Sequence, residues 1–165
     1  MTRKTARQIA VQLLFSMETN RISPNEATEL FFSEEHYGSL SEEDEIYREL
    51  PDTAQMDYIQ KVTEEAAAHL SEIDAVISRY SKAWKRERLS KTTLAILRCA
   101  ICEILYLDDI PDSAAINEAV ELGKYYDSPQ AAAFINGLLG SFLKTEVTFQ
   151  NSESVQSPGE ETEDA

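Results

Sequence analysis

The segment from Leu89 to Leu107 restricts the fold more than any other part of this 165-residue chain. Between Leu94 and its end, Arg98 and Glu103 are its only charged residues. A helix that is apolar on nearly every side must be buried on nearly every side. This segment is too short and too often interrupted by charge to span a bilayer, which takes roughly 20 apolar residues in a row. We therefore expect it to be the central helix of a soluble protein, with the other segments packed around it.

The remaining segments also show helical periodicity, and the chain has only five glycines and five prolines. This pattern predicts an all-α fold of about seven helices. Ser90 is the expected N-cap of the central helix, and Ser71 with Asp74 forms a near capping box for another. Gly123 indicates a close crossing of two helices. Besides the central helix, we expect helices at 3–19, after Pro24, at 53–70, from 71, at 114–126, and from Pro129 to about 144.

The net charge of −15 is concentrated in two stretches. Residues 34–57 hold nine acids against Arg48, and residues 146–165 hold six acids and no base. We expect the stretch at about 34–52 to be a solvated insertion, either a loop or a loosely held helix, rather than a mimic of nucleic acid. The end of the chain, 146–165, is predicted to be a disordered tail, which leaves 1–145 as one helical domain.

The rest of the chain is nearly neutral and carries two local basic runs. In the first predicted helix, Arg3, Lys4 and Arg7 fall within an arc of roughly 100° that continues to Phe15. Such an arc suits a nucleic-acid strand, because basic side chains contact phosphates and an aromatic ring stacks on nucleobases. Packing of Phe15 against another helix is the simpler interpretation. For the second run, from Arg79 to Lys91, a solvated helix face is the simpler interpretation.

Motifs that carry chemistry are scarce in this sequence. It has no glycine-rich phosphate loop, nucleophile elbow or zinc signature. Cys99 and Cys102 form a C-x-x-C pattern, but they lie within a predicted helix and lack the further cysteines of a four-thiolate site, so we expect both in the core. No signal peptide is apparent at the N-terminus. We therefore expect a cytoplasmic binding protein without a cofactor or metal, and not an enzyme.

Several stretches, taken together and in order, are more specific than any single motif. They cover residues 3 to about 143 and are Thr5–Phe15, Leu89–Lys91, Ala95–Arg98 with Glu103–Tyr106, Ala115–Lys124 and Phe134–Leu139. In this combination the sequence resembles the NusB family of transcription antitermination factors. The resemblance implies two small helical bundles packed around the central helix. It also implies binding of boxA-type single-stranded RNA from ribosomal RNA leaders together with ribosomal protein S-ten (NusE), within an antitermination complex on RNA polymerase.

The resemblance also implies which residues bind these partners. The expected RNA contacts are Arg3, Lys4, Arg7 and Phe15, with a second region at Ser128, Gln130 and Phe134. In the second region this chain has three alanines, 131–133, where family members often carry basic or polar residues. Unaided RNA binding is therefore expected to be weaker, with greater dependence on NusE. For the NusE contact the resemblance indicates the segment entering the central helix, including Glu87 and Arg88.

Two other functions compete with this interpretation. The chain could be a protein-interaction adaptor or a homodimer that keeps the fold with weak or lost RNA binding, which its acidic balance favours. NusB-like domains also precede ribosomal RNA cytosine methyltransferase domains. The absence of a glycine-rich cofactor motif from this sequence disfavours that enzyme.

Overall fold

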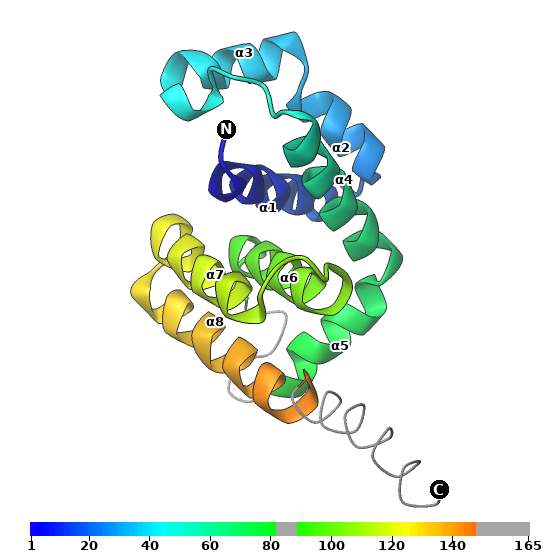
Figure 1. The fold of residues 1–165 in the computed structure, drawn as a ribbon, viewed down its shortest axis with the longest axis vertical. Helices are drawn as coiled ribbons and strands as arrows, with labels where there is room; N and C mark the ends of the chain where they lie inside the picture. Colours follow the sequence, from blue (N-terminus) through cyan, green and yellow to red (C-terminus); the bar gives the residue numbers. More distant parts are fainter. Residues whose placement is uncertain (82–88, 148–165) are drawn as a thin grey trace, which may run out of the picture.

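The computed structural model describes residues 1–81 and 89–147, which form an all-α fold (Figure 1). No strand occurs within these two ranges, so the predicted fold class is confirmed. A 3-10 helix, η1 (Glu45–Tyr47), and a π-helical turn, η3 (Leu143–Val147), accompany the α-helices. The α-helices are α1 (Arg3–Asn20), α2 (Pro24–Phe31), α3 (Glu34–Glu43), α4 (Thr53–Ala68), α5 (Leu70–Tyr80), α6 (Lys91–Tyr106), α7 (Asp112–Tyr126) and α8 (Pro129–Phe142).

Helix α6 is the central element, as its apolar sequence predicts. Every residue from Thr93 to Glu103 is buried, and α6 packs against α1, α4, α5, α7 and α8. The Ser90 hydroxyl accepts a hydrogen bond from the Thr93 N–H at 3.0 Å, which confirms the expected N-cap. Helices α1–α4 form one group and α5–α8 the other, and they join chiefly where α6 packs on α1 and α4 (Figure 1). The two predicted bundles are thus present.

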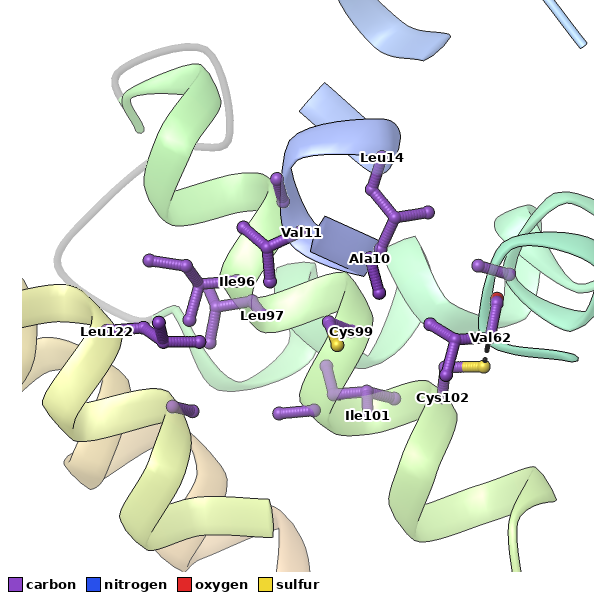
Figure 2. Packing of buried hydrophobic residues seen from close by; sticks show 14 of the residues in the cluster. Ala10, Val11, Leu14, Val62, Ile96, Leu97, Cys99, Ile101, Cys102 and Leu122 are labelled. Carbon is purple, nitrogen blue, oxygen red and sulfur yellow. Dashed lines mark hydrogen bonds between the residues drawn. The ribbon is translucent and has the colours of Figure 1, made fainter. Parts of the chain in front are cut away.

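Both cysteines lie in the core around α6, as predicted (Figure 2). The Cys102 thiol donates a hydrogen bond to the Val62 carbonyl at 3.5 Å. Burial, more than the nearby charges, raises the pKa of Cys102 to about 12, and it raises that of Cys99 as well. Both side chains therefore remain neutral thiols at physiological pH and act as small apolar groups in the core.

A buried ion pair links three helices through Arg98. Its Nε and Nη2 donate to the two carboxylate oxygens of Asp74 at 2.9 Å each, and its Nη1 donates to Glu18 at 2.8 Å. The expected capping role of Asp74 is therefore wrong. Only His69 separates the end of α4 from the start of α5 at Leu70, so Ser71 lies inside α5 and is not its N-cap.

The acidic stretch is better ordered than predicted, because it contains α3 and η1. Its acids occupy exposed positions, while Tyr37 and Tyr47 are buried with their ring centroids 6.1 Å apart. The Tyr37 hydroxyl donates to the Glu49 carbonyl at 2.8 Å, and the Gln12 amide of α1 donates to the Tyr47 hydroxyl at 2.9 Å. Two tyrosines thus fix a segment that its charge alone suggests is loose.

Helices α7 and α8 cross closely at Gly123, as expected. A Cβ placed on this residue would lie 2.8 Å from Cδ1 of Ile135 and 3.2 Å from Cα of Ala132. Beyond α8, Val147 packs against the core and Glu146 pairs with Arg79 of α5. The first two residues of the predicted tail therefore belong to the packed domain, and the remainder of the tail lies outside the described residues.

In the described residues, no helix is both long enough and apolar enough to cross a membrane.

Candidate nucleic-acid interface

The three bases at the start of α1 have very different surroundings. Lys4 is exposed. Arg3 is half-buried, with its guanidinium carbon 4.5 Å from the centre of the Tyr58 ring in a cation–π contact. Arg7 is only 5% exposed. Of the three basic residues predicted to contact RNA, only Lys4 is therefore fully exposed.

Arg7 is buried because α6 supplies it with a partner. Its Nε donates to Oε1 of Glu103 at 2.8 Å, and the Tyr58 hydroxyl of α4 donates to the same oxygen. Burial, together with neighbouring Cys99 and Glu103, raises the pKa of Tyr58 far above its usual value, so the phenol keeps its proton. Arg7 and the Tyr58 hydroxyl thus share one carboxylate oxygen of the fully buried Glu103. Arg7 thus links α1 of one bundle to α6 of the other.

Phe15 borders a groove on the outer side of α1, which we call the Phe15 groove. Its volume is about 490 Å³, and it is also lined by Leu30 and Phe31 of α2, by Thr92 of α6 and by Tyr126 of α7. None of its lining residues is Asp, Glu, Lys or Arg. The ring of Phe15 is 37% exposed, so it is packed on one side and open on the other. Such a ring can still present a surface to a ligand.

The second predicted region surrounds a smaller hollow, which we call the Phe134 hollow. Ser128, Gln130 and Phe134 line it together with Asp127 and Thr93, and its volume is about 200 Å³. Ser128 is the N-cap of α8, and its hydroxyl accepts from the Ala131 N–H at 3.0 Å. The structure thus gathers all three predicted residues of this region at one place.

Asp127 is held between two hydroxyl groups at the rim of the Phe134 hollow. Ser90 and Thr93 both donate to its Oδ2 at 2.7 Å. These hydrogen bonds hold the pKa of Asp127 below its usual value, so its carboxylate stays ionised and directed at α6. This cluster ties the start of α6 to the end of α7.

The two hollows adjoin at neighbouring residues. Thr92 lines the Phe15 groove and Thr93 the Phe134 hollow, while Tyr126 lines the groove and Asp127 the hollow. We call these four residues the α6–α7 seam. Phe15 and Phe134 are far apart in the sequence, yet they border hollows on opposite sides of this seam. The arrangement offers two aromatic rings on a surface whose one carboxylate, Asp127, is engaged by Ser90 and Thr93, and such rings are suited to unstacked nucleobases.

Comparison with known proteins identifies the family. The family model described as NusB matches residues 4–144. The chain belongs to the NusB family. Among its relatives, the transcription antitermination protein NusB of Alkaliphilus oremlandii is 39% identical over 88% of this chain and 96% of its own length. That of Acetivibrio thermocellus is 39% identical over 89% and 92%, respectively. The family resemblance predicted from the sequence is thereby confirmed.

Solved structures share the NusB fold. NusB from T. maritima matches with a TM-score of 0.72 at 27% identity, covering 88% of this chain and 92% of that protein. NusB from Aquifex aeolicus matches with a TM-score of 0.65 at 26% identity, covering 88% and 90%. A chain from a complex of the antitermination factors NusB and NusE with double-stranded RNA matches at 23% identity, with a TM-score of 0.70 and coverage of 86% and 96%. At that identity the likeness shows the fold alone.

Glu87 and Arg88, the expected NusE contacts, lie outside the described residues. The sequence prediction also missed Tyr58 and Glu103 as the partners of Arg7. No local signal could have identified them, because Glu103 is 96 positions away in the sequence. The one available hint was a carboxylate in an otherwise apolar helix, which requires a buried partner.

Proposed function

We propose that this chain is a transcription antitermination factor that binds boxA-type single-stranded RNA of ribosomal RNA leaders together with ribosomal protein S-ten. The observation that carries the antitermination role is membership of the NusB family over nearly the whole domain. The proposed complex joins RNA polymerase in the cytoplasm and supports ribosomal RNA transcription. The role requires binding alone, so no residue is assigned to catalysis.

The proposed RNA surface follows the α6–α7 seam. It consists of Lys4 and Phe15 of α1, with Arg3 at its edge, and of Ser128, Gln130 and Phe134. Arg7 is left out, because a phosphate contact would require breaking its buried pair with Glu103. With one or two bases available, phosphate contacts contribute little, and most of the affinity is expected from stacking and from the protein partner.

The partner surface is proposed at the entry to α6, from Arg86 to Thr93, with Glu87 and Arg88 as its charged members. Within this segment, the hydroxyls of Ser90 and Thr93 are both engaged with Asp127. Binding of S-ten there would lie next to the Phe134 hollow, which Thr93 also lines. The proposal therefore predicts that S-ten and RNA bind adjacent surfaces and increase each other's affinity.

The test is binding of a short boxA-type RNA and of a scrambled one, with and without S-ten, over a series of salt concentrations. We expect preference for the boxA-type RNA, increased by S-ten. With Arg3 and Lys4 as the only phosphate contacts, the logarithm of affinity should fall with the logarithm of salt at a slope of about −1.4, taking ~0.7 per contact. Absence of binding to either RNA, with or without S-ten, would refute the RNA role.

A charge-reversal pair locates the surface. Lys4→Glu should weaken RNA binding, because it replaces a phosphate contact by repulsion. Lys61→Glu makes the same charge change at an exposed position of α4 outside the proposed RNA surface, so it is the matched control. Equal effects of the two variants would show that net charge, rather than this surface, determines binding.

The second candidate is a protein-interaction adaptor or homodimer with weak or lost RNA binding. The burial of Arg7 favours it, because one of the three expected bases is unavailable. In the same binding experiment, a stable complex with S-ten that binds neither RNA would support the adaptor function. Sedimentation of the free protein would separate the monomer from the homodimer.

A further inference from the structure

Tyr125, in the last turn of α7, is the most exposed large apolar or aromatic residue of the described chain, with 73% of its surface open to solvent. The function proposed above does not use it, and neither the sequence patterns nor the family resemblance points to it. A single exposed apolar residue is common and needs no explanation by itself. What distinguishes Tyr125 is how its ring is held and where it lies.

The ring of Tyr125 is braced by its neighbour. It meets the ring of Tyr126 edge to face, with centroids 4.8 Å apart and planes at 88°. Tyr126 in turn packs against the core, and burial, together with nearby Tyr47, raises its pKa to about 12. Tyr126 is therefore a fixed, neutral support. A ring held in this way loses little conformational freedom when a ligand stacks on it.

The position of Tyr125 places it beside the α6–α7 seam. The two residues that follow it are Tyr126, which lines the Phe15 groove, and Asp127, which lines the Phe134 hollow. In Figure 1 the end of α7 lies next to the start of α8, where the Phe134 hollow is formed. Tyr125 lines neither hollow itself, but its ring contacts Tyr126 of the Phe15 groove, so it adds an aromatic ring at the margin of the surface that presents Phe15 and Phe134.

The charges around Tyr125 fit a nucleotide better than an isolated apolar ligand. The preceding residue, Lys124, is exposed, and its Nζ lies 3.6 Å from Oε1 of Glu121 in an ion pair that is open to solvent and to exchange with a phosphate. The nearby carboxylate of Asp127 is engaged by Ser90 and Thr93. An exposed ring next to an accessible cation is the combination with which proteins bind single-stranded RNA.

We propose that Tyr125 is a base-stacking residue, on whose open ring face one nucleobase of the bound single-stranded RNA lies. This inference rests on the RNA binding proposed above and adds a contact to the same surface. It also offers a physical reason why a surface with few basic side chains can bind RNA. Stacking on an aromatic ring does not depend on phosphate neutralisation, so it is less sensitive to salt.

The test compares variants of the full chain on the same boxA-type RNA, in the presence of S-ten. Tyr125→Ala should weaken binding about tenfold, the size expected for one lost stack. Tyr125→Phe should bind as the unmodified protein does, because stacking needs the ring and not the hydroxyl. Leu50→Ala is the matched control, since Leu50 is 66% exposed and lies in the acidic stretch away from the seam. Thermal unfolding should be unchanged in all three.

A scan of the RNA with single abasic sites locates the stacked base. At one position the abasic RNA should bind the unmodified protein about tenfold less tightly, and Tyr125→Ala should cause no further loss there. Equal RNA binding by the unmodified protein and Tyr125→Ala would overturn the inference while leaving the proposed function intact. Weaker binding of S-ten alone by Tyr125→Ala would show a protein contact and overturn it as well. If the unmodified protein binds no RNA, both proposals fail.

Discussion

At the scale of single residues, burial decides what a charged side chain does. Arg7 and Lys4 lie in the same turn of α1, but one is paired with Glu103 inside the protein and the other is exposed. The periodicity of α1 indicates which side of the helix each residue occupies. It does not indicate that α6 presents a carboxylate, that of Glu103, to the guanidinium of Arg7. The difference between a phosphate contact and a structural ion pair therefore arises from another helix.

Replacing Arg7 by Met should destabilise the fold. The variant leaves the Glu103 carboxylate buried without its cation, which should lower the free energy of unfolding by about 3–5 kcal/mol. Urea unfolding monitored by circular dichroism measures this loss. The combined variant Arg7→Met, Tyr58→Phe, Glu103→Leu removes the buried carboxylate together with its two hydrogen-bond donors and should recover most of the stability. A fully stable Arg7→Met protein that had lost RNA binding would restore Arg7 to the RNA surface.

At the scale of elements, a helix could be predicted where its own residues indicate both its burial and its ends. The run from Leu94 to Cys102, interrupted only by Arg98, predicts a buried α6, and the Ser90 cap fixes its start. In α3 the acidic composition gives no indication that Tyr37 is buried. Tyr37 is buried because it packs against Phe31, Phe32 and Tyr47. Contacts of that kind form only in the folded chain. The α6–α7 seam could not be predicted for the same reason, since its residues come from separate helices that meet only in the folded chain.

The crossing of α7 and α8 makes a prediction with its own control. Gly123→Ala places a methyl group 2.8 Å from Cδ1 of the fully buried Ile135, so the helices must separate or Ile135 must shift. Overpacking of this kind costs about 1–3 kcal/mol and outweighs the gain of about 1 kcal/mol in helix propensity. In Gly137→Ala, within α8, the new methyl group meets nothing within 4 Å and should stabilise the protein by about 0.5–1 kcal/mol.

Urea unfolding of the two glycine variants should therefore move in opposite directions. Adding Ile135→Val to Gly123→Ala removes the methyl group that is struck and should restore part of the loss. If both glycine variants were stabilised equally, the close approach of α7 to α8 would be wrong.

At the scale of the whole molecule, the two bundles share α6, and the acidic charge is unevenly distributed around them. The exposed acids of α3 and η1 belong to a segment that packs along α1, since Tyr47 receives a hydrogen bond from Gln12 and Glu49 lies 3.6 Å from the N-terminal amine. Lys4 lies in the same stretch of α1. The negative field of this segment therefore acts on the part of the proposed RNA surface that depends most on positive charge.

Neutralising this segment should raise RNA affinity. The variant Glu42→Gln, Glu43→Gln, Glu45→Gln removes three exposed charges and leaves Tyr37 and Tyr47 in place, so the packing of α3 and η1 should survive. We expect tighter binding of both boxA-type and scrambled RNA at low salt, because a long-range field does not distinguish sequences. The gain should vanish near 1 M salt, where the screening length falls to about 3 Å. A gain that persisted at high salt, or that was confined to the boxA-type RNA, would instead mean that these glutamates act by direct contact.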